Sequence, residues 1–272
     1  MEQIEAKQTS TEISNNEGRD IIDEKYSNIR LQNIRLHKDS TTVKNNYVLE
    51  WFSEPISKIY SFRIKSGIEN KTVLEKVNKS LKEHQLNNIS NFYECSNNER
   101  KRGEYNYTID GIFITNNFLS IECSIYYDCG GVHPNEDNDN LTVNLRTGKV
   151  IKYFDEIFPL AGQSKRAYSE SKNSKLSESY DNYLISLGNK IIKIISILHS
   201  KEINDSSSYC QYYTPDKWYY ASFTFRYDGL YLNPSFPHVS MSCAYPEFSL
   251  IPYKYLIKYL NKDSKFVFDK IK

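Results

Sequence analysis

Apolar and polar residues alternate along several short stretches of the chain, which is the pattern of half-buried β-strands. Two of these stretches, residues 111–114 and 118–127, are separated by Thr115-Asn116-Asn117, and asparagine tolerates the backbone conformation of a tight turn. They therefore predict a β-hairpin. The complete set of predicted strands covers residues 47–51, 59–64, 89–95, 105–109, 111–114, 118–127, 141–145, 150–153, 218–227, 230–232 and 239–243.

The spacing of the apolar residues changes to three or four in two longer stretches, and this spacing predicts amphipathic helices. Val73, Val77 and Leu81 mark the apolar face of the first, over residues 70–86. The second covers residues 176–198 and has one continuous apolar face. A helix of this kind is expected to pack across a sheet.

Shorter helical segments are predicted at residues 155–158 and 252–260. Runs of neighbouring strands with only a few inserted helices indicate an α+β fold. We expect mainly antiparallel sheets, with the two main helices packed on one face and a short helix at the C-terminus.

Polar segments divide the chain. Residues 1–25 are polar and are predicted to be a flexible tether, and residues 162–175 are a Ser- and Lys-rich connection. We therefore expect an N-terminal α+β subdomain over residues 26–160. Residues 161–272 form a C-terminal α+β part that packs with it as one globular unit.

Composition narrows the function classes. The 35 basic and 34 acidic residues are spread along the 272-residue chain, so no nucleic-acid-binding face is expected. No apolar stretch reaches the roughly 18 residues of a membrane-spanning helix, and the polar start lacks the apolar region of a signal peptide. The protein is therefore either cytoplasmic, or a periplasmic or cell-envelope protein whose export signal was replaced by Met1, with a tether once joined to a lipid anchor. The 23 tyrosines suit sheets and also protein-binding surfaces.

The five cysteines form no Cys-x-x-Cys motif, which argues against a zinc or thioredoxin-type site. Cys123 and Cys129 lie six residues apart near the end of one predicted strand, about 20 Å when extended, so they cannot bond to each other. Pairing with Cys95, Cys210 or Cys243 stays open. Because five is odd, at least one thiol is free within a monomer, and the count is compatible with an oxidising compartment.

A sharp break follows the strand at residues 118–127. Gly130, Gly131 and Pro134 cannot continue a strand or a helix, and they place His133 close to Asp128 in the sequence. These two side chains could form a general acid–base pair, or the imidazole could join His238 in a metal site. The favoured interpretation is that His133 stabilises the turn through hydrogen bonds to the backbone.

No known catalytic pattern supports the first two alternatives. The chain has no Gly-x-Ser-x-Gly elbow and no His-Glu-x-x-His helix. The acidic residues 136–139 resemble a calcium loop in composition but lack its spacing, so a solvated loop is expected there. A second tight turn is predicted at Gly148. The sequence thus predicts no catalytic residue, no metal and no cofactor.

A series of motifs resembles a known family. The series runs through Gly67-Ile68-Glu69-Asn70, Asp128-Cys129-Gly130-Gly131-Val132-His133-Pro134-Asn135, Thr147-Gly148-Lys149, Asp155-Glu156-Ile157-Phe158 and Ile251-Pro252-Tyr253. It resembles the envelope domain shared by the ectodomain of the lysozyme-sensing anti-sigma factor and certain peptidoglycan deacetylases. The resemblance covers residues 45–262.

The resemblance implies an extracytoplasmic, non-enzymatic domain that binds a protein or cell-wall material. A free-standing copy is expected to be an immunity or inhibitor protein that binds a secreted toxin or a lysozyme-like cell-wall hydrolase. The alternatives are a peptidoglycan-binding module, with exposed tyrosines and Trp51 or Trp218 as platforms, and a cell-wall enzyme centred on His133 and Asp128. The candidate partner-binding residues are Asp128, His133, Asn135, Glu136, Asp137, Phe236, His238 and Tyr245.

Overall fold

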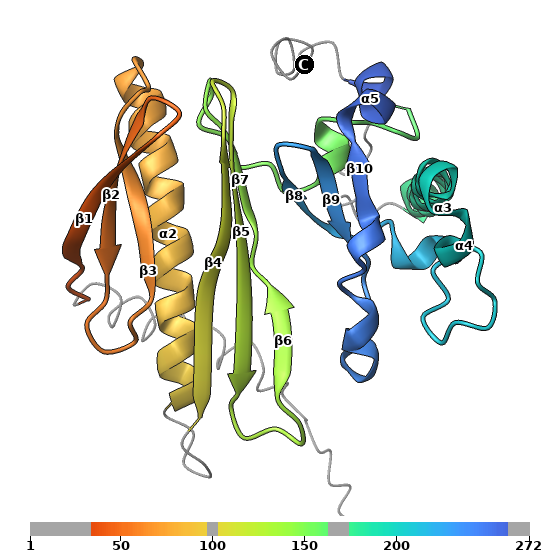
Figure 1. Ribbon diagram of the computed structural model, residues 1–272, viewed down its shortest axis with the longest axis horizontal. Coiled ribbons are helices and arrows are strands. Elements are labelled where there is room, and N and C mark those ends of the chain that lie inside the picture. The colour runs from red at the N-terminus through yellow and green to blue at the C-terminus, as the bar shows by residue number, and fades with distance from the viewer. Residues whose placement is uncertain (1–33, 97–102, 163–173, 261–272) are drawn as a thin grey trace, which may run out of the picture.

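The computed structural model describes residues 34–96, 103–162 and 174–260 (Figure 1). Within these ranges the strands form three antiparallel sheets, which confirms the expected α+β class. The strands are β1 (His37–Lys44), β2 (Tyr47–Ser53), β3 (Tyr60–Ser66), β4 (Glu104–Ile114), β5 (Phe118–Asp128), β6 (Asn135–Asn138), β7 (Leu141–Asn144), β8 (Ser222–Phe225), β9 (Gly229–Asn233) and β10 (Leu250–Pro252).

The helical segments connect and cover these sheets. The two long ones are α2 (Lys71–Ser96) and α3 (Ser174–Leu198). The short ones are η1 (Phe154–Glu156), α4 (Ser200–Ile203), η3 (Pro215–Lys217), η4 (His238–Cys243), η5 (Glu247–Ser249), α5 (Tyr253–Leu256) and η6 (Ile257–Tyr259). The last helices confirm the short C-terminal helix. In the described ranges no helix has both the length and the apolar character needed to cross a bilayer.

The elements stack in layers that Figure 1 shows side by side. Helix α2 packs between β3 of the first sheet and β4 of the central sheet. On the other side, β5 of the central sheet contacts β8, and α3 lies beyond the sheet formed by β8, β9 and β10. That both main helices pack on one face, and that the chain divides at residue 160, stay predictions.

Strand β5 separates two hydrophobic cores because its side chains alternate between its two faces. Leu119 and Ile121 belong to the first core with α2 and β3, whereas Phe118 belongs to the second core. In the first core, the Asn78 side chain of α2 bonds to the backbone of β3 as a neighbouring strand would. It accepts the Ile64 N–H at 2.8 Å and donates to the Ile64 carbonyl at 2.9 Å.

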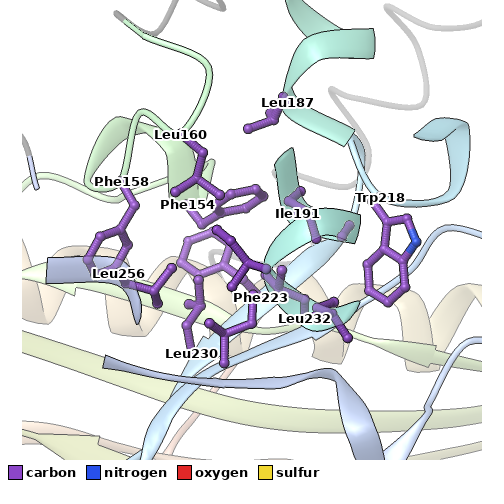
Figure 2. Close-up of a cluster of buried hydrophobic side chains, with 14 of the residues drawn as sticks. Phe154, Phe158, Leu160, Leu187, Ile191, Trp218, Phe223, Leu230, Leu232 and Leu256 are labelled. Atoms are coloured by element: carbon purple, nitrogen blue, oxygen red, sulfur yellow. The ribbon is translucent and has the colours of Figure 1, made fainter. Parts of the chain in front are cut away.

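The second core collects large apolar side chains from η1, α3, β8, β9 and α5 (Figure 2). Its largest member is Trp218, which is fully buried and donates its indole N–H to the Tyr212 carbonyl at 2.7 Å. The labelled neighbours in Figure 2 are Phe154, Phe158, Leu160, Leu187, Ile191, Phe223, Leu230, Leu232 and Leu256.

Two predicted strands are wrong. Residues 89–95 continue α2, because Gln85 and Asn88 are buried members of its apolar stripe and interrupt the hydrophobic period that would have shown it. Residues 239–243 lie in η4, where Ser240 N–H bonds to the Pro237 carbonyl and the flanking prolines lack ladder donors.

Other boundaries also differ from expectation. Residues 150–153 make only an isolated bridge between Val150 and Val143. Strand β8 starts at Ser222, later than expected, because the preceding residues fold around Trp218. The pattern missed β1, β6 and β10. The expected turn at Gly148 is confirmed: its φ is +73°, and an added Cβ would lie 2.6 Å from the Cβ of Lys76.

Candidate functional site

The break after β5 is a reversal of the chain that leads into a strand. Gly130 has a φ of +88°, a conformation that glycine adopts without strain, and Asp128 Oδ1 accepts its N–H at 3.3 Å. The chain then returns as β6, antiparallel to β5, with Tyr126 opposite Glu136. The predicted solvated loop at residues 136–139 is therefore wrong for its first three residues. Acidic side chains are tolerated there because β6 is an edge strand.

The structure contradicts the predicted role of His133 in the turn. His133 is exposed, and among the described residues its imidazole makes no hydrogen bond or ion pair, so it neither pairs with Asp128 nor stabilises the turn. Its contribution is a backbone carbonyl, which accepts the Asn135 amide at 3.4 Å. Gly131 does not need a positive φ, and an added Cβ would meet only the His133 carbonyl at 3.7 Å. Pro134 is exposed beside them.

The segment from Cys129 to Asp139 is fastened to α2 at both ends. At its start, Cys129 forms a disulfide with Cys95 in the last turn of α2. At its end, His84 Nε2 lies 2.9 Å from both the carbonyl and a carboxylate oxygen of Asp139, and Asn88 donates to the same carboxylate at 2.5 Å. Both Asp139 groups are acceptors, so Nε2 carries the proton. These two anchors fix where β6 presents its side chains.

The anchor at Asp139 leads us to predict that the stability of the protein depends on acid pH. Burial raises the pKa of the Asp139 carboxyl, but the hydrogen bonds from His84 and Asn88 outweigh burial and leave it below its usual value. A carboxyl with a lowered pKa stabilises the fold above the ordinary Asp pKa of about 4, and this contribution is lost as the pH falls through the folded-state value. The urea midpoint of the native chain should therefore fall more steeply below about pH 4 than that of Asp139→Asn.

The matched control is Asp110→Asn, which removes an exposed carboxylate of β4 instead. Its midpoint should follow the native pH profile. Identical profiles for the native chain and Asp139→Asn would show that the Asp139 anchor contributes nothing to stability.

A pocket of about 260 Å³ lies between β6 and the chain that surrounds β8, β9 and η4. Four of the predicted partner-binding residues line it, although a hundred residues separate the two pairs in the sequence: Glu136 and Asp137 on one side, Phe236 and Tyr245 on the other. The remaining lining residues are Asn138, Tyr220, Ser222, Asn233, Pro234, Ser235 and Ala244.

Strand alternation explains why β6 serves two surfaces. Glu136 and Tyr126 are opposite each other on β6 and β5, and Asp137 and Ile125 form the next pair, which points to the other face. A second, more open pocket of about 390 Å³ lies on the α2 side, lined by Asn91, Glu94, Cys95, Tyr105, Ile125, Tyr127, Cys129 and Asp137. Asp137 thus lines both pockets.

One lining residue of the first pocket is unusual. Asn233 ends β9 opposite Ser222, is only 5% exposed, and both polar atoms of its side-chain amide lack a hydrogen-bond partner among the described residues. An unpaired buried amide costs about 1–3 kcal/mol, so such groups are rare and need a reason. Because Asn233 lines the pocket, a ligand in the pocket would be able to supply the missing partners.

The electrostatics of the pocket are negative. Burial, with the negative charges of Asp137 and Glu136 next in importance, raises the pKa of Tyr245 to about 12. The phenol therefore stays neutral and keeps its O–H donor at physiological pH. Neither Glu136 nor Asp137 has a cationic partner within the part of the chain that the structure describes.

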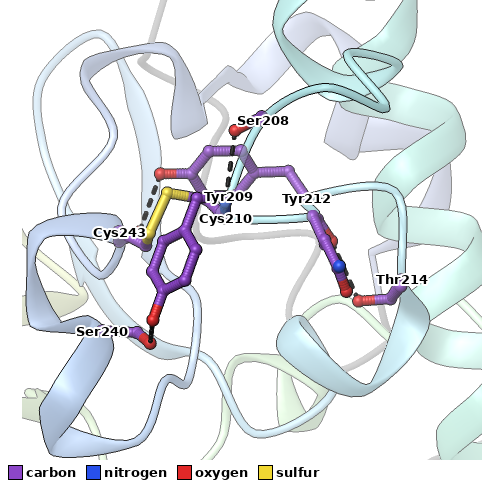
Figure 3. Close-up of a disulfide and its surroundings, with 8 residues drawn as sticks. Ser208, Tyr209, Cys210, Tyr212, Thr214, Ser240 and Cys243 are labelled. Atoms are coloured by element: carbon purple, nitrogen blue, oxygen red, sulfur yellow. Dashed lines mark hydrogen bonds between the residues drawn. A yellow bond between two sulfur atoms is a disulfide. The ribbon is translucent and has the colours of Figure 1, made fainter.

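The wall opposite β6 is fastened by the second disulfide, Cys210–Cys243 (Figure 3). Tyr212 donates its hydroxyl to the Cys243 carbonyl at 2.9 Å, and the Tyr209 hydroxyl lies 2.9 Å from that of Ser240. Since Ala244 and Tyr245 follow Cys243 directly, these bonds position the aromatic side of the pocket.

The other predicted site residues lie elsewhere. Asp128 ends β5, Asn135 begins β6 and His133 lies in the turn between them, and none of the three lines the pocket. His238 begins η4, but its side chain lies outside the described residues. No group of three or more metal-ligating residues is present in the described ranges.

Sequence reasoning missed Asn233, Ser222 and Tyr220. A signal for the first existed: the Asn233-Pro234 step ends an apolar strand and marks a turn. Nothing in that step shows that the amide is buried in a pocket, because β6 comes from a distant part of the chain.

Among the described residues, Cys123 is the free cysteine, and it is buried beside the Tyr107 hydroxyl, 3.1 Å from its sulfur. Burial raises the pKa of the Cys123 thiol, so it is an inert core residue rather than a nucleophile.

No protein-family model matches the chain and no curated protein is significantly similar to it, so the resemblance to the envelope domain stays a prediction.

Proposed function

We propose that the chain is a non-enzymatic binding protein of the cell envelope that neutralises a secreted toxin or a lysozyme-like cell-wall hydrolase by direct contact. The observation that carries this proposal is the acidic and aromatic pocket, which brings Glu136 and Asp137 together with Phe236 and Tyr245. Protein interfaces concentrate their binding energy in a few anchors around such pockets, with tyrosine and arginine over-represented.

The envelope location is supported by the two disulfides. Stable disulfides belong to oxidising compartments and are rare in the cytosol. Both join segments that build the binding region: Cys95–Cys129 fixes the start of the β6 segment, and Cys210–Cys243 fixes the aromatic wall.

The test uses the full chain as an inhibitor. Increasing amounts are added to a lysozyme acting on purified peptidoglycan, and in parallel to the toxin encoded beside its own gene, if one is present. Inhibition that saturates at one chain per enzyme supports the proposal, and the double variant Glu136→Gln/Tyr245→Ala should reduce it. Full enzyme activity at excess chain, with no complex by size-exclusion chromatography, contradicts it.

A second candidate, a peptidoglycan-binding module, is favoured by one observation. An amide, two carboxylates and aromatic rings line a pocket of about 260 Å³, below the usual 300–1,000 Å³ of small-molecule sites and therefore suited to one sugar ring or one side chain. Trp218 is excluded as a sugar platform because it is fully buried, and Trp51 is partly buried. Sedimentation of the chain with insoluble peptidoglycan, without inhibition of any hydrolase, would favour this module.

A further inference from the structure

The pocket between β6 and β9 carries uncompensated negative charge. Glu136 and Asp137 are exposed carboxylates on an edge strand and have no cationic partner in the described ranges. One cation beside the lining is Lys217, whose ammonium lies 5.4 Å from the centre of the Phe236 ring. Its charge is already paired with Asp216 at 2.9 Å. The field inside the pocket therefore favours a ligand of positive charge.

The polar side of the pocket would match a ligand that both donates and accepts hydrogen bonds. Asn233 is only 5% exposed, and the oxygen and nitrogen of its side-chain amide both lack hydrogen-bond partners among the described residues. A ligand with several N–H donors would satisfy the oxygen, and a nearby carbonyl would satisfy the nitrogen. A peptide segment carries both kinds of group.

The rim is aromatic. Tyr220 is 54% exposed, and Tyr245 and Phe236 are partly buried on the same side of the pocket. Aromatic faces attract cations, and a guanidinium combines this attraction with planar stacking. An ammonium is a compact, strongly hydrated charge and gains less from such a rim.

We propose that the pocket binds the guanidinium of an arginine side chain presented by a protein partner. This inference rests on the proposed function and gives the chemistry of its anchor. The guanidinium donates to the Glu136 carboxylate and to the Asn233 oxygen, Asp137 adds its negative charge at the edge of the pocket, and the aromatic rim covers the faces of the guanidinium. The pocket volume of about 260 Å³ suits one side chain and its stem.

The test measures binding of small probes to the full chain by isothermal titration calorimetry at low salt. N-acetyl-arginine amide is expected to bind with a Kd of about 1 mM, as a single anchored side chain should. Its neutral isostere, N-acetyl-citrulline amide, should bind at least about tenfold more weakly, because the charge-assisted hydrogen bonds are lost. N-acetyl-lysine amide and glucosamine complete the panel.

Three variants assign the binding to the pocket. Glu136→Gln/Asp137→Asn should weaken the arginine probe about tenfold or more, and Asn233→Ala should weaken it about threefold or more. The control Glu69→Gln/Glu75→Gln removes two exposed carboxylates that do not line the pocket and should leave the Kd unchanged. Circular dichroism confirms that each variant is folded.

Several outcomes would overturn the arginine proposal. Equal binding of arginine and citrulline, or equal loss in the control, shows that the carboxylates do not recognise the charge. Tighter binding of glucosamine assigns the pocket to an amino sugar. If no probe binds while the chain still inhibits its target enzyme, the arginine anchor is wrong and the proposed function stands. If the arginine probe binds and no enzyme is inhibited, the arginine anchor stands and the proposed function is wrong.

Discussion

Replacing Trp218 by alanine is expected to lower the free energy of unfolding by about 3–5 kcal/mol. Trp218 is fully buried in the second core, and its indole N–H bonds to the Tyr212 carbonyl, so the substitution leaves both a cavity and an unpaired acceptor. Urea unfolding followed by far-ultraviolet circular dichroism measures the change.

The chain has two tryptophans, one associated with each core, and this makes the control informative. Trp51→Ala removes a partly buried ring from the edge of the first core and should cost much less. In Trp218→Ala, the fluorescence of Trp51 reports on the first core alone. Its midpoint should fall with that of the second core, because Phe118 and Leu119 are neighbours on β5 and belong to opposite cores. An unchanged Trp51 midpoint would show that the cores unfold independently.

Much of the fold follows from local patterns in the sequence. The hairpin of β4 and β5 and the helix α3 appear at the predicted places because each has a clear period of two or four. The short C-terminal helix also appears where it is predicted, directly after Pro252. The helix predicted from the sequence ends at residue 86, ten residues before α2 does, because the polar Gln85 and Asn88 interrupt the apolar stripe of α2. Each is buried for a partner elsewhere: Gln85 donates to the Phe52 carbonyl, and Asn88 binds Asp139. Such long-range partners leave no local signal.

The candidate site was only partly predictable. The sequence points to the acidic Glu136 and Asp137 and to the aromatic Phe236 and Tyr245 because they lie in loop-like, partner-accessible stretches, and the fold brings these stretches together. His133 draws attention in the sequence because histidine beside glycine and proline suggests chemistry, but it does not line the pocket. Asn233 became visible only through its burial and its unpaired amide, which are properties of the three-dimensional structure.

Two disulfides hold the two sides of the binding region in place. The β6 side is held to α2 at Cys129 and at Asp139, and the aromatic side is held at Cys243. Edge strands and irregular segments have fewer backbone hydrogen bonds than central strands, so these anchors restrict the motion of the pocket walls. Rigid walls reduce the entropy that a partner's side chain must overcome on binding.

Loss of the Cys95–Cys129 disulfide is expected to destabilise the chain by about 4 kcal/mol, from the chain entropy of a closed loop of this length. The two cysteines are 34 residues apart in the sequence. Cys95→Ser/Cys129→Ser should lower the urea midpoint and also weaken binding of the arginine probe, because the start of the β6 segment loses its anchor on α2.

The control for this experiment is Cys210→Ser/Cys243→Ser, which opens a loop of nearly the same length, 33 residues, and should cost about the same stability through the second core. Thiol titration of the denatured native chain should find one free thiol, that of Cys123, because the other four of the five cysteines are paired. Three or more free thiols, or an unchanged midpoint in Cys95→Ser/Cys129→Ser, would contradict the covalent anchor and leave Asp139 as the support that fixes β6.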